Sequence, residues 1–203
     1  MRGAVTSQSW LLALALLAAG SRVGADPALY TIDPSHTHPL VEVDHFDGLS
    51  VWRGLFRESR GTVTLDRDKA TGSVEIVIET GSIDFGHDKL NQVVVGGKIG
   101  DWNGLDVARF PTAAYRGTLG GFVNGAPTTL TGELTLHGVT RPVTLRIDTF
   151  KCIATHPISG KEVCGADASG SFNRADFGVN AGMQYGFRQT VTLRIQVEAI
   201  RRQ

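Results

Sequence analysis

Histidines near the start of the chain are the side chains best suited to metal chemistry. His36, His38 and His45 lie close together, and Asp44 is beside them. A metal site needs three or four ligands that converge on one point. On a regular strand His36 and His38 share one face and His45 points to the other, so only a bulge at Pro39 brings all three together. The spacing therefore predicts no metal site, and His36 is expected to form a hydrogen bond that fixes the first turn.

Residue types that serve hydrolysis are also present, but in no recognisable arrangement. His137, with Asp167 or Asp176 and a serine such as Ser171, has the composition of a catalytic triad. The sequence contains no Gly-x-Ser-x-Gly elbow, and no triad order stands out. The pair His137-Gly138 is better interpreted as a hairpin turn, because glycine tolerates positive φ and the imidazole can bond the backbone. We therefore expect a protein that is not an enzyme, with no catalytic residues and no cofactor.

The first 25 residues have the pattern of a signal peptide. Met1-Arg2 is a short basic start, Trp10 to Ala19 is an apolar run, and Val23-Gly24-Ala25 supplies small residues before Asp26. The apolar run is too short to span a bilayer as a helix. We expect cleavage after residue 25, export to the periplasm and no stable membrane insertion. An uncleaved anchor is the alternative.

The expected export determines which oxidation state we predict for the two cysteines, Cys152 and Cys164. In an oxidising compartment such a pair is expected to form a disulfide. The competing interpretation is a metal or redox pair, but the spacing does not match Cys-x-x-Cys and no other ligands cluster beside it. A bond would close a loop of about a dozen residues and contribute roughly 3 kcal/mol in the chain-entropy description.

The charge balance limits the possible partners. Lys plus Arg and Asp plus Glu each number 20, so the formal net charge is zero. A neutral chain has no electrostatic reason to bind nucleic acid or an anionic membrane. We expect no nucleic-acid binding, a monomer or weak homodimer, and a partner that is recognised by shape and by burial of apolar surface.

Period-two alternation of apolar and polar residues dominates from Asp26 onward. The pattern predicts strands with one apolar and one wet face, and it recurs at 41–45, 62–66, 74–79, 134–136, 143–147 and 191–198. Turn signals separate these runs, among them Gly48 and Asn124-Gly125. Only the stretch from about Gly86 to Lys98 is weakly amphipathic as a helix. We therefore expect one all-β domain over residues 26–203, either a sandwich or a barrel.

A barrel of about eight strands has an interior that side chains fill or that holds one small ligand. Periodicity alone favours a filled core, although the inward candidates are mostly aliphatic and few are large aromatic residues. The choice between a filled and a ligand-holding barrel stays open at this level.

Several local strings go beyond periodicity. Tyr30 to His36 (YTIDPSH) opens the domain, Gly132 to Val143 (GELTLHGVTRPV) lies in its centre, and Arg174 to Gly178 (RADFG) comes near its end. In this order they closely resemble the YceI-like family, and the resemblance covers essentially all of residues 26–203. The central string is the most specific. The segment from Gln92 to Gly104 departs from the family pattern, so it is where ligand choice and access are least predictable.

The resemblance implies a lipocalin-like antiparallel β-barrel of about eight strands with a short helical segment near its mouth. It also implies a polyisoprenoid lipid or isoprenoid quinone in the barrel interior, carried or stored without catalysis. The alternative is an exported structural or stress-interaction domain with a filled core and no lipid ligand.

On this interpretation the apolar faces of the strands line one continuous channel. The side chains expected to contact the lipid are Val41, Val43, Phe56, Val63, Leu65, Val74, Ile76, Ile78, Ile83, Tyr115, Leu134, Leu136, Leu145, Phe172, Val191 and Leu193. Arg174 and Asp176 would share one face of a strand. We expect them to form a structural pair at one barrel end, and the competing role for Arg174 is contact with a head group near the mouth, where Tyr115 is a second candidate.

Overall fold

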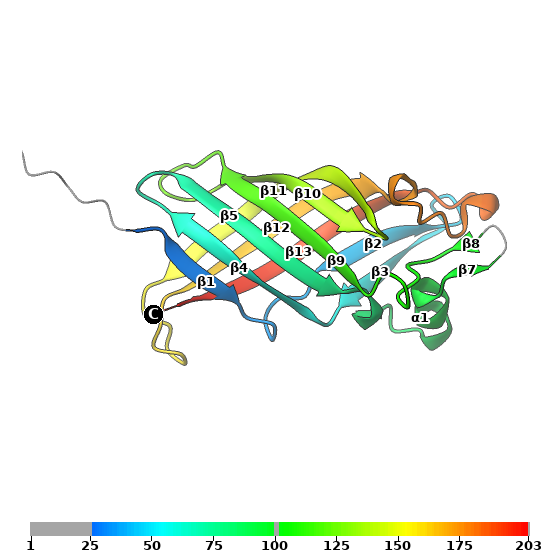
Figure 1. The fold of residues 1–203 in the computed structure, drawn as a ribbon, viewed down its shortest axis with the longest axis horizontal. Coiled ribbons are helices and arrows are strands. Elements are labelled where there is room, and N and C mark those ends of the chain that lie inside the picture. Colours follow the sequence, from blue (N-terminus) through cyan, green and yellow to red (C-terminus); the bar gives the residue numbers. More distant parts are fainter. Residues whose placement is uncertain (1–25, 100–101, 203) are drawn as a thin grey trace, which may run out of the picture.

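The chain forms an antiparallel β-barrel whose strands run obliquely around a long axis (Figure 1). The computed structural model describes residues 26–99 and 102–202, so the expected signal peptide at residues 1–25 lies outside the described residues. The strands are β1 (Ala28–Ile32), β2 (Leu40–His45), β3 (Ser50–Phe56), β4 (Ser59–Asp66), β5 (Thr71–Glu79), β6 (Ile83–Asp84), β7 (Lys98–Ile99), β8 (Trp102–Asn103), β9 (Thr112–Gly120), β10 (Thr129–Leu136), β11 (Val139–Ile153), β12 (Val163–Asn173) and β13 (Thr190–Arg201).

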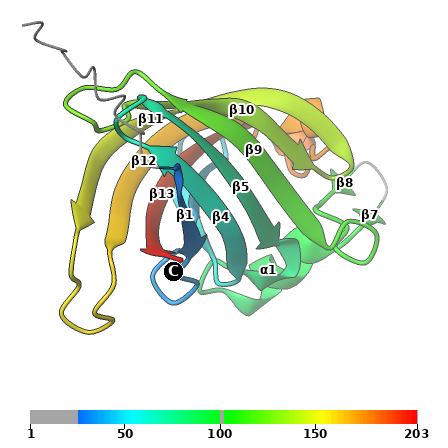
Figure 2. The same ribbon diagram turned by 60° about the vertical axis from the view of Figure 1, so that its left-hand side comes forward.

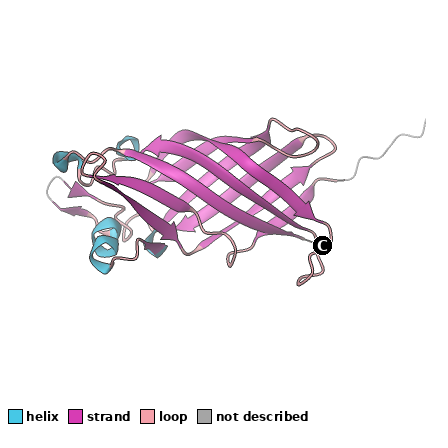
Figure 3. Cartoon of the chain, turned by 180° about the vertical axis from the view of Figure 1, so that it is seen from behind, coloured by secondary structure: helices cyan, strands magenta, loops and turns pink. Residues whose placement is uncertain are grey.

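Helical structure in the described part of the chain is short. One α-helix, α1 (Asp88–Val95), falls inside the stretch predicted to be helical, and three single 3₁₀ turns accompany it: η1 (Thr80–Ser82), η2 (Arg174–Phe177) and η3 (Met183–Tyr185). The side chain of His87 caps α1 by accepting a hydrogen bond from the Leu90 amide at 3.2 Å. Figure 3 shows the helices gathered at one end of the barrel, the end that also carries β7 and β8. We call this end the mouth.

Eight of the described strands close the barrel. They follow the order β1-β4-β5-β9-β10-β11-β12-β13, and β13 pairs back with β1, where Thr31 lies opposite Ile200 (Figure 2). All of these pairings are antiparallel. The prediction of a lipocalin-like antiparallel barrel of about eight strands is therefore confirmed.

Near the mouth, β2, β3 and β6 extend the sheet from β13. The first half of β13 pairs with β2, with Leu193 opposite Val41, whereas its last residues pair with β1. The break between β1 and β2 is sealed by Thr37, whose hydroxyl donates to the Glu198 carbonyl at 3.2 Å and accepts from the Glu198 amide at 3.1 Å. Ser59 donates to the Thr37 carbonyl at 2.9 Å. Neither β1 nor β2 pairs with β13 at Glu198. These hydrogen bonds therefore satisfy backbone groups that would otherwise have no partner.

The hairpin between β10 and β11 turns on His137 and Gly138, as predicted. Both residues have positive φ, 52° and 74° respectively, which is the conformation of a two-residue type I′ turn. The imidazole nitrogen Nδ1 of His137 lies 3.1 Å from the Phe177 carbonyl, so the ring connects the hairpin to η2. This histidine therefore has a structural role.

The Asp33 turn after β1 also follows the sequence interpretation. The Asp33 carboxylate accepts from the Ser35 amide at 2.9 Å, and its second oxygen lies 2.9 Å from Nδ1 of His36. Asp33, His36 and Glu198 bring possible ligand atoms within 4.8 Å of one another, and His36 is exposed. The Asp33–His36 contact orders the turn and does not need an ion.

Candidate ligand-binding cavity

The interior of the barrel contains a cavity of about 270 Å³ whose wall is almost entirely apolar. Nearly all of the side chains predicted to face inward line it: Val41, Val43, Phe56, Val63, Val74, Ile76, Ile78, Ile83, Tyr115, Leu134, Leu136, Leu145, Phe172, Val191 and Leu193. They come from strands around the whole ring, because alternate residues of each strand point to the same side of the sheet. Protein interiors rarely leave voids larger than a water molecule, so a space of this size is unlike a filled core.

Leu65 is the exception among the predicted lining residues. It is buried, but it is not part of the cavity wall. It lies next to the β4–β5 turn, at the end of the barrel away from the mouth, where Tyr30, Leu119 and Ala199 are also buried outside the cavity wall. These four residues belong to the hydrophobic core at this end of the barrel. The alternation places Leu65 on the correct face, but its position along the axis puts it beyond the cavity wall.

Other residues line the cavity that were not predicted. Ile195 and Val197 continue the inward face of β13, so the same alternation could have found them. Trp52 shares the inward face of β3 with Phe56, so alternation could have found it too. A further group comes from α1, the short β8 and irregular segments at the mouth and has no period-two signal: Phe85, Leu90, Val94, Trp102, Leu105, Val179, Ala181 and Phe187.

The segment around α1 caps the barrel, and it overlaps the stretch at which the sequence departs from the family pattern. Leu90 and Val94, one helical turn apart, both line the cavity. The chain after β8 is tied to the end of the helix, because the Leu105 amide donates to the Val94 carbonyl at 2.8 Å and the Val107 amide to the Val95 carbonyl at 3.1 Å. A side chain at Gly104 would come within 2.7 Å of the Val94 carbonyl, so only glycine permits this close approach.

Asp84 holds this cap against the rest of the barrel. Its carboxylate accepts from Arg57 at 2.8 Å, from the Gly86 amide at 2.7 Å and from Asn91 in α1 at 3.1 Å. The Arg57 hydrogen bond, followed by the bonds from Gly86 and Asn91, lowers the pKa of Asp84 to about 2. The ionised form of Asp84 is therefore the form that joins β3, β6 and α1.

Stability in acid should reveal this link. Because the folded-state pKa is depressed, the stabilisation by Asp84 is present above its ordinary value of 3.8 and is lost as pH falls towards about 2. We expect the Asp84→Asn variant to melt below the wild type at neutral pH, and the difference to shrink as pH falls through that window. Thermal unfolding of both proteins across the window measures the difference. A difference that stays constant with pH would show that the Asp84 charge does not stabilise the cap.

Tyr115 is buried in the barrel wall with its hydroxyl already engaged. The hydroxyl donates to the Val143 carbonyl at 2.7 Å and lies 3.2 Å from the Leu130 carbonyl. Burial raises the pKa of Tyr115 to about 12, so the phenol stays neutral. Its ring lies close to Gly117, where an added Cβ would be 2.8 Å from ring atom Cε1. The ring of Tyr115 therefore lines the cavity, whereas its hydroxyl group is hydrogen-bonded to the backbone of the sheet.

Arg174 does not lie in a strand, and it does not form the predicted pair with Asp176. It begins η2, and its guanidinium donates from Nη1 to the Val179 carbonyl at 3.3 Å and from Nη2 to the Ala181 carbonyl at 2.6 Å. The chain turns because the Asn173 side chain caps η2 and Gly178, with φ of 76°, ends it. Arg174 is only 9% exposed and lines the cavity. Burial lowers the pKa of Arg174, and the charge of Asp44 opposes that shift.

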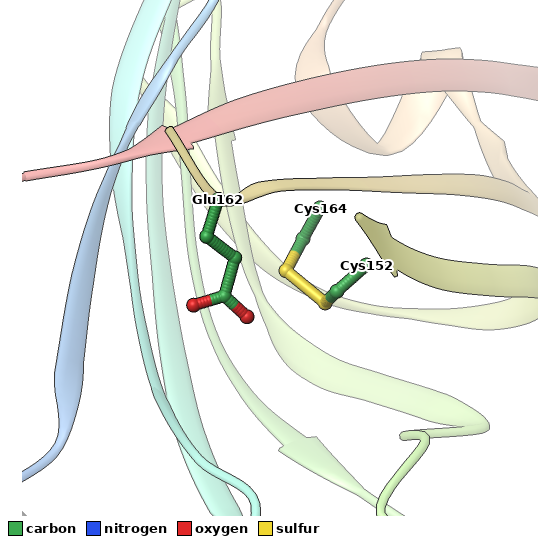
Figure 4. Close-up of side chains that lie close together, drawn as sticks. All are labelled: Cys152, Glu162 and Cys164. Atoms are coloured by element: carbon green, nitrogen blue, oxygen red, sulfur yellow. A yellow bond between two sulfur atoms is a disulfide. The ribbon is translucent and has the colours of Figure 1, made fainter. Parts of the chain in front are cut away.

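The predicted disulfide between Cys152 and Cys164 is confirmed. The two cysteines lie directly opposite each other on β11 and β12, and the bond closes the hairpin that contains His156. Figure 4 shows Glu162 beside the bond. The Glu162 carboxylate is 2.6 Å from Arg67 and 2.7 Å from Arg201. Since both sulfurs are bonded to each other and the carboxylate is paired, this cluster holds the hairpin to the barrel end.

The fold and cavity define a class of protein: a closed antiparallel barrel with an apolar cavity in its interior and a capped mouth. The chain belongs to the YceI-like domain family, whose sequence profile matches residues 30–199. A UPF0312 protein of Pseudomonas putida strain W619 is 31% identical over 193 residues, which cover 94% of each chain. No helix in the described part of the chain has the length and apolar character needed to cross a membrane.

Solved structures share the fold at lower sequence identity. BcnA of Burkholderia cenocepacia has a TM-score of 0.61 at 20% identity and covers 82% of this chain and 98% of its own. A polyisoprenoid-binding domain from Saccharophagus degradans has a TM-score of 0.56 at 14% identity and covers 85% of this chain and 98% of its own. These similarities establish the architecture.

Proposed function

We propose that the protein binds one long apolar lipid in the barrel and carries or stores it without chemical change. The observation that carries this proposal is the apolar cavity of about 270 Å³ inside the barrel, which contacts strands around the whole ring. Ligand pockets commonly measure about 300–1,000 Å³, so this cavity of about 270 Å³ is slightly smaller than that range and fits a thin chain better than a bulky ring system.

An isoprenoid chain, free or attached to a quinone, is the lipid that we propose. One structural neighbour is named as a polyisoprenoid-binding domain, which supports this choice. Burial of one five-carbon unit contributes roughly 3–4 kcal/mol before the costs of ordering the chain. Several units can therefore bind tightly against a wall that offers branched aliphatic side chains and very few polar groups.

The compartment and the partners follow from the sequence. The signal-peptide pattern of residues 1–25 and the Cys152–Cys164 disulfide support export to the periplasm. The balance of 20 basic and 20 acidic residues gives no basis for nucleic-acid binding and is consistent with a monomer or weak homodimer. The rival function is an exported structural or stress-interaction domain, which has no use for an open apolar cavity.

Extraction of the purified protein distinguishes the two functions. We expect protein isolated from the periplasm to release a prenyl lipid into organic solvent, close to one molecule per chain by mass spectrometry. Recovery of no lipid from folded protein, together with no binding of added prenyl lipid, would favour the structural domain and contradict the carrier.

A further inference from the structure

The mouth of the cavity contains two N–H donors whose capacity the protein does not use fully. The indole nitrogen of Trp102 is buried and has no hydrogen-bond partner among the described residues. Arg174 is 9% exposed, and two of its nitrogens donate hydrogen bonds to main-chain carbonyls. A guanidinium group has five N–H donors, so some of them remain available for another acceptor. Both side chains line the cavity. A buried donor without a partner costs free energy, so this arrangement calls for an acceptor.

Direct backbone contacts bring these two donors to the same part of the mouth. The carbonyl of Asn103, the residue after Trp102, accepts a hydrogen bond from the Ala181 amide at 3.2 Å. The carbonyl of Ala181 in turn accepts from Arg174 at 2.6 Å. The Asn103 side chain also donates to the Gly178 carbonyl. The β8 segment and the loop after η2 are therefore bonded to each other, and each contributes one donor.

Other polar side chains of the wall are already engaged by the protein. Thr37 exchanges hydrogen bonds with the Glu198 backbone, and Tyr115 donates to the Val143 carbonyl. The carboxylate of Asp44 accepts from the Arg188 amide at 2.9 Å. Trp102 and Arg174 are therefore the side chains that would donate hydrogen bonds to a polar group of the ligand.

We infer that Trp102 and Arg174 form an anchor for a neutral carbonyl oxygen at the head of the bound lipid, an inference that rests on the proposed function. Two N–H donors match the two lone pairs of one carbonyl oxygen. A phosphate head fits less well, because Arg174 and Asp44 are the charged residues that line the cavity in the described part of the chain. One guanidinium opposed by one carboxylate cannot neutralise a buried phosphate.

The test compares the delipidated protein with three probes that share one prenyl chain: the hydrocarbon, a methyl ketone and a monophosphate. We expect the wild type to bind the ketone about tenfold more tightly than the hydrocarbon, as one to two added hydrogen bonds allow. Trp102→Phe keeps an aromatic ring and removes one of the two donors, so it should reduce the ratio of ketone affinity to hydrocarbon affinity from about tenfold to about threefold.

Arg174→Met gives a second measurement, although it also removes bonds to the Val179 and Ala181 carbonyls and can fail to fold. The conclusion therefore rests on Trp102→Phe. Tyr185→Phe is the control, because it removes a hydroxyl group near the mouth from a side chain that is 59% exposed, lies in η3 and is not part of the cavity wall. It should change neither affinity.

Each result has a defined meaning. Equal affinity of the wild type for ketone and hydrocarbon, or the same loss in Tyr185→Phe as in Trp102→Phe, would overturn the anchor while leaving the lipid-binding function in place. Tighter binding of the monophosphate than of the ketone would overturn the neutral head group. Failure of the wild type to bind any of the three probes would overturn the proposed function itself.

Discussion

Replacement of Ile76 with tryptophan is expected to abolish the lipid that co-purifies with the protein while the barrel still folds. Ile76 lies in β5 between Gly61 on β4 and Tyr115 on β9, and its side chain lines the cavity. An indole in this place occupies space that the lipid chain needs. Overpacking typically costs about 1–3 kcal/mol, and the empty cavity beside the new ring should keep the cost near the lower value. Organic extraction and mass spectrometry should then recover almost no lipid.

Leu136→Trp repeats the test from another strand, since Leu136 ends β10 and also lines the cavity. Glu75→Gln and Arg194→Gln are the controls, because both residues are exposed on the outer face and form only surface ion pairs. The controls should keep the lipid content of the wild type. Folded Ile76→Trp and Leu136→Trp proteins with unchanged lipid content would place the lipid outside the barrel, and the carrier function would then be wrong.

The strands and their inward faces could be predicted because each strand has one face in an apolar interior and one in water. In β13, Val191 and Leu193 identify the inward face, and Ile195 and Val197 extend it. Alternation reports the face of a residue but not its depth along the barrel axis. For this reason Leu65 is predicted to line the cavity, whereas it is buried in the core outside the cavity wall.

The mouth could not be predicted in the same way, because its residues are placed by backbone hydrogen bonds between irregular segments. Trp102 and Leu105 reach the cavity through the pairing of their segment with the end of α1 and with the loop after η2. No periodic pattern encodes such contacts. The turn at Arg174 did have a local signal, since Asn173 and Gly178 flank it as cap residues. Alternation had suggested a continuing strand, and the capping pattern was the better guide.

Removal of the disulfide is expected to destabilise the barrel without emptying it. A Cys152→Ala and Cys164→Ala double variant reopens a loop with a sequence separation of 12 residues. The chain-entropy description gives a loss of about 3 kcal/mol in the free energy of unfolding, which lowers Tm by roughly 6–12 °C for a domain of this size. Lipid content should stay at the wild-type level, because neither cysteine lines the cavity.

Reductant provides the matched comparison for this prediction. It should lower the Tm of the wild type towards that of the double variant and leave the variant unchanged. The ion pairs of Glu162 with Arg67 and Arg201 remain in both proteins, so the difference reports the covalent bond. Alkylation of both thiols in periplasmic protein without reductant would show that the bond does not form there. Equal Tm values for the oxidised wild type and the variant would show that β11 and β12 hold the hairpin closed by their hydrogen bonds alone.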